Sequence, residues 1–568
     1  MDHEHSSNNG AGKSSAEHST QKPASETSNS LTTRYIGKIF EIIDSTPRFS
    51  LETKTLTDET GNIEIGAYCL VQYLTYAILA QIVELSASAR AEAERHGRIE
   101  LLASIDLDNC ELIPGVSRLP SIGAHVFLAS EGLVQALFEP AGKDKGQLIN
   151  LGSLNTRDGV SLSVTPDMLF AKHLGVVGAT GSGKSNTVAK LVEECLKLKS
   201  KLILLDPSGE YGSIKSKYAK HVHLGELEKA GTQSKQVVVP YYHLTESDLT
   251  AIFKPTGQSQ APKLRAAMKS LKLAILSPGL AVEGNIMKAD KEKRFFEAEY
   301  ARHIRAVDNP LAIFDISKLP QQIENECVKP NRSAVEPLFW GAINPIEVAH
   351  CTPLVVRVSD IISADEISCI FNPGKLPSLL DEIEEFIDNP SLRVLRVSLE
   401  TLPFLYNARE IVSNAIGRQI LLLARQGRFK KSPVVIMMDE AHQFLNSNLE
   451  NDPSLPNIDA ISLIAKEGRK YGSALCLATQ RPKDIPESIL SQLSTYIIHR
   501  VTNQSDLSIL ESASGNLDPG MLAMIPSLGP GKCLIMGSAV PFPMIAQIEQ
   551  AKQEPDSETP SFSDYWRN

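Results

Sequence analysis

Gly178-Ala-Thr-Gly-Ser-Gly-Lys-Ser185 is the stretch that decides the fold of this 568-residue chain. It matches the pattern Gly-x-x-x-x-Gly-Lys-Ser/Thr in full. The apolar run at 173–177 predicts a buried strand before it, and the apolar face of residues 185–198 predicts a helix after it. Glycines between a strand and a helix N-terminus let backbone N–H groups converge on phosphate oxygens. The sequence therefore predicts a phosphate-binding loop rather than a chance glycine turn.

This loop and the first helical turn supply the candidate nucleotide-binding residues. They are Gly178, Ala179, Thr180, Gly181, Ser182, Gly183, Lys184, Ser185 and Asn186. In a loop of this kind the lysine reaches the β- and γ-phosphates, and the hydroxyl that follows it binds Mg²⁺. We therefore expect ATP and Mg²⁺ as cofactors, with Lys184 catalytic and Ser185 a metal ligand.

Further apolar runs recur along the chain at 201–206, 434–439, 474–479, 496–500 and 532–537. Continuous apolar strands that alternate with helical segments are typical of a parallel sheet covered on both faces. The fold class expected from this pattern is α/β.

Two of these runs end in polar residues that suit phosphoryl transfer. Asp439 and Glu440 follow one strand, where Asp439 would hold Mg²⁺ through water and Glu440 would polarise the attacking water. Gln480 follows the next strand and can sense the γ-phosphate or orient that water. The alternatives are a buried strand capped by two solvated acids, and a polar turn closed by Pro482. An Asn-Lys-x-Asp pattern that would recognise guanine is absent from the sequence.

Two other motifs leave their roles open. Asp206-Pro-Ser-Gly-Glu210-Tyr211 follows a core strand, where it can tune metal binding, contact a neighbouring subunit or form a plain turn. Arg469, in Lys466-Glu-Gly-Arg-Lys-Tyr-Gly472, is a candidate arginine finger inserted into a neighbour's ATP site. Its alternative role is to complement a helix dipole. The basic cluster at 425–431 is interpreted as a solvated helix end.

Composition places limits on class and partners. Apolar residues make up 42% of the chain and charged residues 22%, which is ordinary globular composition. The net charge of −10 excludes a bulk polycation, so nucleic acid would have to bind a local basic surface. The eight scattered cysteines form no Cys-x-x-Cys pair and are expected to be reduced. A cytoplasmic protein without a membrane partner is expected, because the chain has no signal-like start and no run of about 18 apolar residues.

The chain divides by composition and pattern into several segments. Short strand candidates with turn signals every eight to twelve residues, interrupted by a helical turn at 87–96, predict a small β-barrel. The expected divisions are a disordered tail at 1–32, the β-barrel at 33–155, the α/β core at 156–244 and 391–550, an inserted helical subdomain at 245–390, and a loose polar tail at 551–568.

Taken together, the motifs resemble the HerA family of the FtsK–HerA superfamily of ring ATPases. The resemblance is carried by residues 178–186, 206–211, 439–442, 467–472 and 479–482. It implies a RecA-like P-loop ATPase core with an N-terminal β-barrel of the type shared with ATP synthase subunits. It also implies that Lys184, Ser185, Asp439, Glu440 and Gln480 carry catalysis and that Arg469 is the finger in trans.

The function implied by the resemblance is that of an ATP-hydrolysing ring motor. It would be a homo-hexamer that translocates or unwinds double-stranded DNA in its central channel, with a nuclease or sirtuin-like effector, in end processing or antiviral defence. The alternative from a different class is an ATP-binding ring scaffold that assembles and regulates an effector enzyme without translocating. A conjugation or secretion ATPase is a third reading, which the missing membrane span and the barrel disfavour.

Overall fold

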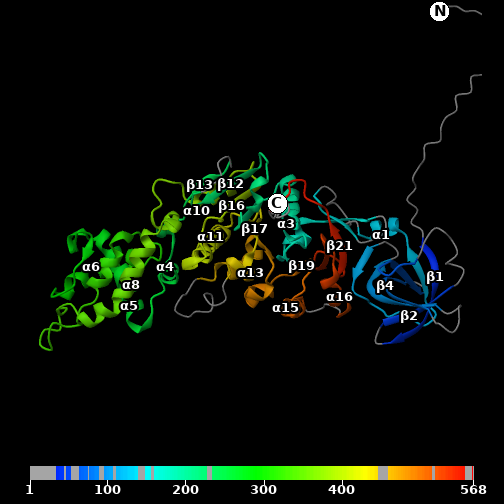
Figure 1. The fold of residues 1–568 in the computed structure, drawn as a ribbon, viewed down its shortest axis with the longest axis horizontal. Helices are drawn as coiled ribbons and strands as arrows, with labels where there is room; N and C mark the ends of the chain where they lie inside the picture. The colour runs from blue at the N-terminus through cyan, green and yellow to red at the C-terminus, as the bar shows by residue number, and fades with distance from the viewer. Residues whose placement is uncertain are drawn as a thin grey trace, which may run out of the picture.

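The computed structural model describes residues 33–43, 46–52, 63–73, 76–87, 95–106, 111–138, 147–154, 159–226, 233–445, 458–514, 519–556 and 566. The tail expected at 1–32 lies outside these residues. Figure 1 shows an elongated molecule with a β-barrel at one end, a large sheet in the middle and a group of helices at the other end.

The central sheet contains twelve strands. Their order is β13 (Lys235–Val237), β12 (Ala219–Leu224), β16 (Val394–Ser398), β11 (Leu202–Asp206), β17 (Val434–Met438), β18 (Ser473–Thr479), β10 (Leu174–Val177), β19 (Thr495–Ile498), β20 (Lys532–Gly537), β21 (Met544–Ile548), β8 (Ile149–Leu154) and β9 (Ser161–Val164). Neighbouring strands from β13 to β19 are parallel, and those from β19 to β9 are antiparallel. The expected parallel α/β core is confirmed, and the antiparallel extension was not expected.

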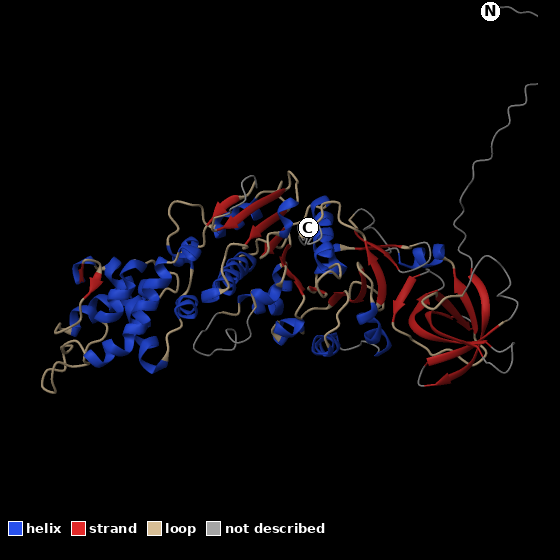
Figure 2. Ribbon diagram, in the orientation of Figure 1, coloured by secondary structure: helices blue, strands red, loops and turns tan. Residues whose placement is uncertain are grey.

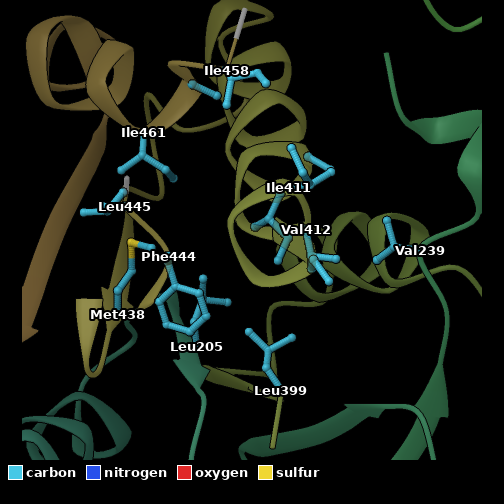
Figure 3. Close-up of a cluster of buried hydrophobic side chains, with 14 of the residues drawn as sticks. Leu205, Val239, Leu399, Ile411, Val412, Met438, Phe444, Leu445, Ile458 and Ile461 are labelled. Atoms are coloured by element: carbon cyan, nitrogen blue, oxygen red, sulfur yellow. The ribbon is translucent and has the colours of Figure 1, made fainter. Parts of the chain in front are cut away.

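Both faces of the parallel strands are buried, which explains their continuous apolar sequences. In β11 the side chains of Ile203 and Leu205 join one apolar cluster, and those of Leu202 and Leu204 join another. Helices α11 (Ala408–Arg425) and α13 (Ala460–Tyr471) cover the first face, as Figure 3 shows for part of that cluster. Helix α3 (Lys184–Lys197) covers the second face.

The N-terminal strands form a closed barrel of six strands, because β2 pairs with β5 as well as with β1. The strands of this sheet are β2 (Thr46–Leu51), β1 (Thr33–Ile43), β7 (His125–Ala129), β3 (Tyr68–Tyr73), β4 (Tyr76–Ala87), β5 (Arg95–Asp106) and β6 (Glu111–Pro114). The expected barrel is thus confirmed. The barrel contacts the core through a cluster of Tyr68, Phe138 and Phe542 rings, with centroids 5.5 to 6.2 Å apart.

The prediction of a helical turn at 87–96 is wrong for Ala87, Arg95 and His96, the residues of this stretch that the structure describes. Ala87 ends β4 and pairs with Arg95, and Ser86 pairs with His96. The alanine, glutamate and arginine residues of this stretch favour a helix locally. At the described pairs Ser86–His96 and Ala87–Arg95, the ladder between two long strands outweighs that preference, because each added pair extends hydrogen bonding already in place.

A group of helices lies beyond the sheet edge formed by β13, blue in Figure 2 and labelled in Figure 1 as α4 (Glu246–Phe253), α5 (Gly257–Leu276), α6 (Lys293–Val307) and α8 (Pro345–Ser363). The remaining helices in the described residues are α1 (Glu131–Phe138), α2 (Pro166–Phe170), α7 (Leu319–Asn325), α9 (Ser368–Phe371), α10 (Leu379–Asp388), α14 (Glu487–Leu490), α15 (Gln504–Ser514) and α16 (Pro519–Met524). Helices α4 to α10 lie within the stretch where an inserted helical segment is expected.

Two expectations from composition can be compared with the described residues. Seven of the cysteines lie among them, and all seven are free and buried. Cys110 lies outside. None of the helices in the described part has the length and apolarity that a membrane crossing requires.

Candidate functional site

The glycine-rich loop joins β10 to α3, as its sequence predicts. Gly183 is the N-cap of α3 with φ of 112°, a left-handed conformation in which a side chain would be strained, and no side chain caps the helix. A Cβ on Gly178 would lie 2.5 Å from the Ser182 hydroxyl and 2.7 Å from Cβ of His499. The glycines therefore let the loop close over the helix end, where the first N–H groups of α3 are available to an anion.

Lys184 lies between the two acidic residues that follow β17. Its Nζ is hydrogen-bonded to Asp439 and lies 3.0 Å from Oε1 of Glu440. Burial by itself lowers the pKa of Lys184, but these carboxylates outweigh burial and raise that pKa above its usual value. The three charges meet because β10 and β17 flank β18 in parallel, so their carboxyl ends share one edge of the sheet.

Gln480 links the loop to the acidic pair from the end of β18. Its Nε2 donates to Oε1 of Glu440 at 2.5 Å, and its Oε1 accepts a hydrogen bond from the Thr180 hydroxyl at 2.6 Å. Glu440 has φ of 44°, which is uncommon for a residue with a side chain and costs free energy. In this conformation the Glu440 carboxylate contacts both Gln480 and Lys184, and these two contacts compensate for the backbone strain.

The turn Asp206–Tyr211 is fixed from several sides. The Asp206 carboxylate accepts the backbone N–H of Gly209 at 2.8 Å and that of Tyr211 at 3.1 Å. The buried guanidinium of Arg396, in β16, binds the same carboxylate at 2.7 Å. The Tyr211 hydroxyl donates to Oδ2 of Asp439 at 2.9 Å, which ties the turn to the acidic pair.

Glu210 lies in this turn with its carboxylate next to the loop. Burial and the nearby Asp439 raise the pKa of Glu210, and a hydrogen bond with the Ser185 side chain lowers it in part. Oε2 of Glu210 is buried and has no hydrogen-bond partner in the described part of the chain, and the same holds for Oε2 of Glu440. Buried carboxylate oxygens of this kind require a donor or a cation.

The residues present fit a hydrated Mg²⁺ ion. Within the described residues there is no group of three or more His, Cys, Asp or Glu side chains that could enclose a metal by itself. Mg²⁺ bound with phosphates needs only one or two protein ligands, because it keeps several waters. Suitable oxygen ligands and water acceptors are the Ser185 hydroxyl, the Asp439 carboxylate and the Oε2 atoms of Glu210 and Glu440, the second of which lies 3.4 Å from Nδ1 of His442.

His499 directly follows β19 and packs against the glycine-rich loop and α3. Its Nδ1 donates to the backbone carbonyl of Lys532 at 3.0 Å, so its Nε2 accepts from the Thr187 hydroxyl of α3 at 2.7 Å. Burial, with a smaller contribution from the charge of Lys184, lowers the pKa of His499 to about 4. The neutral imidazole is therefore part of the structure that holds α3 in place.

The chain after β21 crosses α3 and reaches the Asp206–Tyr211 turn. We call residues 549–556 the C-terminal strap. The contacts of the strap join both elements: Glu549 to Lys190 at 2.5 Å, Ala551 to Asn186 at 2.9 Å, Gln553 to Glu193 at 2.7 Å, Glu554 to Ser213 at 2.9 Å and Asp556 to Glu210 at 2.8 Å. The expectation that this tail is loose from Ala551 onward is wrong for residues 551–556.

The candidate nucleotide-binding residue Asn186 is engaged by the strap. Its Oδ1 accepts the N–H of Ala551, and its Nδ2 donates to the carbonyl of Glu549 at 3.2 Å. Asn186 therefore positions the C-terminal strap against α3 in this structure.

Arg469, the candidate finger, lies away from this site in the same chain. It is exposed in the last turn of α13, which leads into the amino end of β18. Its charge acts on His173, which precedes the amino end of β10. The amino and carboxyl ends of parallel strands lie on opposite edges of the sheet, so Arg469 is remote from Lys184 of its own subunit. Arg469 therefore takes no part in the site of its own chain, and its position in the last turn of α13 also suits the helix dipole.

The structure thus brings together Lys184, Ser185, Asp439, Glu440 and Gln480 and leaves Arg469 apart. Sequence reasoning missed Arg396, His499 and Glu549. An arginine inside a strand and a histidine directly after an apolar run are signals that could have drawn attention to the first two. No comparable signal marks Glu549, because its partner Lys190 lies far away in the chain.

A phosphate-binding loop, an acidic pair after the neighbouring core strand and a glutamine between them, all at the carboxyl edge of a parallel sheet, define a P-loop ATPase of the RecA-like fold. The family described as "Helicase HerA, central domain" matches residues 149–307. The chain is a HerA-like P-loop ATPase, an enzyme that hydrolyses ATP.

Curated relatives agree with this assignment over most of their length. The probable DNA double-strand break repair helicase HerA of Methanocaldococcus jannaschii is 25% identical, over 78% of this chain and 83% of the relative. The DNA double-strand break repair helicase HerA of Pyrococcus furiosus is 24% identical, over 84% and 81%. Among solved structures, VirB4 of Thermoanaerobacter pseudethanolicus aligns with a TM-score of 0.44 at 15% identity, covering 73% of this chain and 99% of that one.

Proposed function

We propose that the chain is one subunit of a ring of six that hydrolyses Mg²⁺-bound ATP to translocate or unwind duplex DNA. The observation that carries the proposal is the connected set of Lys184, Asp439, Glu440 and Gln480 at one edge of the sheet. The names of the curated relatives, which are repair helicases, support DNA as the partner.

Lys184 has two alternative sets of partners in this mechanism. In the structure its ammonium group neutralises Asp439 and Glu440. When ATP binds at the N-terminus of α3, its phosphates compete for the same ammonium group. Bound Mg²⁺ would offset phosphate charge next to Ser185 and Asp439. Glu440, relieved of Lys184, then accepts a proton from the attacking water, and Gln480 holds Glu440 in place.

We propose that a further positive charge for the transition state comes from another subunit. Arg469 is exposed, and it lies at the opposite edge of the sheet from the loop of its own chain. We propose that it enters a neighbour's site, which makes hydrolysis depend on ring assembly. DNA would be held mainly through its phosphates, without sequence readout, so binding should weaken steeply with salt.

We further propose that the ring works with an effector protein, a nuclease or a sirtuin-like enzyme, in DNA end processing or in antiviral defence. The resemblance carried by the motifs at 178–186 and 206–211 supports this part of the proposal. A cytoplasmic location follows from the same proposal, since the DNA to be processed lies there.

The test combines oligomeric mass, ATP turnover with and without duplex DNA, and displacement of a DNA strand or of a triplex-forming strand. We expect a hexamer whose turnover is stimulated by DNA and abolished by Glu440→Gln. The matched control is Glu467→Gln, the same change at a side chain on α13 that pairs with Arg425 at 3.4 Å. It should keep wild-type turnover.

Two results would contradict the proposal in different ways. A hexamer whose turnover ignores DNA, and which displaces no strand with or without an effector, would support the scaffold function instead. A monomer with full turnover would exclude a finger supplied by a neighbour.

A further inference from the structure

The Asp206–Tyr211 turn presents a carboxylate that the mechanism above does not use. The Glu210 carboxylate is hydrogen-bonded to the Ser185 side chain and is close enough to Asp439 to interact with its charge. Its Oε2 is buried and has no hydrogen-bond partner in the described part of the chain. A carboxylate oxygen hidden from water and left unpaired is costly, so its presence calls for a ligand or a function.

The turn holds Glu210 on a rigid support. Arg396 binds Asp206 at 2.7 Å and the Gly209 carbonyl at 3.1 Å, and Asp206 accepts the N–H groups on either side of Glu210. The Glu210 carbonyl accepts the N–H of Asp556 from the C-terminal strap at 2.8 Å. The Arg396 and Asp206 side chains and the C-terminal strap therefore fix the backbone of Glu210.

The chemistry of Ser185 explains what that carboxylate can do. A hydroxyl oxygen that binds a cation must direct its hydrogen toward an acceptor. Asp439 is already engaged, with Oδ1 on Lys184 and Oδ2 on the Tyr211 hydroxyl. Glu210 hydrogen-bonds with the Ser185 side chain, which makes its carboxylate a suitable acceptor for that hydroxyl.

We propose that Glu210 is a positioning residue for the metal–nucleotide site: one carboxylate oxygen accepts the Ser185 hydroxyl, and the unpartnered Oε2 accepts a water of the hydrated Mg²⁺ ion. This inference rests on the proposed use of Mg²⁺, and it goes beyond the set of Lys184, Asp439, Glu440 and Gln480. Glu210 acts through Ser185 and through water, so it touches neither the γ-phosphate nor the attacking water.

The experiment measures Mg²⁺ dependence rather than turnover. Binding of a fluorescent ADP is titrated on the full-length protein in EDTA and in increasing MgCl₂, for wild type, Glu210→Gln and Glu400→Gln. Glu400 is an exposed carboxylate beside Gly209, which makes it a control for loss of charge near the turn. A Mn²⁺ electron paramagnetic resonance spectrum of the ADP complex reports the metal environment directly.

We expect Glu210→Gln to need about 10-fold more Mg²⁺ for half-maximal tightening of ADP binding, the usual effect of losing an outer-shell partner. ADP affinity in EDTA should stay within about twofold of wild type, and the control should match wild type throughout. The change should also be non-additive with Ser185→Ala, because both variants remove parts of one interaction.

An unchanged Mg²⁺ midpoint in Glu210→Gln would overturn the inference. An equal loss of ADP affinity in EDTA and in MgCl₂ would also overturn it, because the residue would then only stabilise the turn. If the effects of Glu210→Gln and Ser185→Ala on the Mg²⁺ midpoint were fully additive, Glu210 would not act through the Ser185 hydroxyl. The assay needs no DNA and no hydrolysis, so it remains decisive even if the protein proves not to be a DNA motor.

Discussion

Acid should weaken the support beneath the phosphate-binding loop, through one histidine. His499 is fully buried, and burial lowers its pKa from 6.5 to about 4. When α3 opens and exposes the imidazole, His499 regains its ordinary pKa and takes up a proton below about pH 6.5. The open form then binds more protons than the folded form, so this part of the stability is complete above that pH and is lost as the pH falls.

The two pKa values set the size of the effect. Integrating the proton uptake from about pH 7.5 to about pH 5 gives a loss of about 2 kcal/mol, or a roughly 30-fold larger open fraction. The assay is hydrogen exchange of the α3 peptide without nucleotide, corrected for the intrinsic pH dependence of exchange. His499→Gln is the reference, because glutamine does not titrate. Parallel pH profiles for wild type and variant would refute the reasoning.

Two further predictions concern the stability of the core, one at the C-cap of α13 and one at the Asp206–Tyr211 turn, each measured as the free energy of unfolding in urea. Gly472→Ala should lower the free energy of unfolding by about 1 to 3 kcal/mol, since φ is +80° and the new Cβ would lie 2.5 Å from the Phe429 carbonyl oxygen. Gly279→Ala, where no atom lies within 4 Å, should change it by about 0.5 kcal/mol or less in the same urea titration. Arg396→Met should cost about 3 to 5 kcal/mol by leaving the buried Asp206 charge unpaired. Adding Asp206→Asn should restore part of that loss, and a double variant no more stable than Arg396→Met would contradict it.

The central strands were predictable because each one carries its own signal. β11 and β17 are buried on both faces, so their sequences are unbroken apolar runs. The same principle explains why β16 was missed. Arg396 interrupts its run, and that cation is tolerated only because Asp206, on the adjacent strand, pairs with it. A partner 190 positions away is not visible in a local pattern.

The candidate site divides in the same way. Lys184, Asp439 and Gln480 each follow a predicted strand, and parallel strands bring their carboxyl ends to one edge. Their meeting therefore follows from topology alone. The C-terminal strap does not, because its contacts with Asn186 and Glu210 depend on where the chain returns after β21. Polar composition predicts a loose segment, but the Glu549–Lys190 ion pair and hydrogen bonds made by the backbone of the strap hold it in place.

The charges at the loop also bear on the proposal that the enzyme works as a ring. Lys184 contributes one positive charge, and Asp439 and Glu440 contribute two negative charges, so the set is net negative before Glu210 is counted. The phosphates of ATP would add several more negative charges, against which the N-terminus of α3 offers only about half a positive charge. A divalent cation is therefore an electrostatic requirement for binding, and a further cation is required when charge moves to the leaving phosphate. Arg469 of the same chain lies at the far edge of the sheet and cannot supply it. This charge balance supports the proposal that Arg469 of a neighbouring chain completes the site.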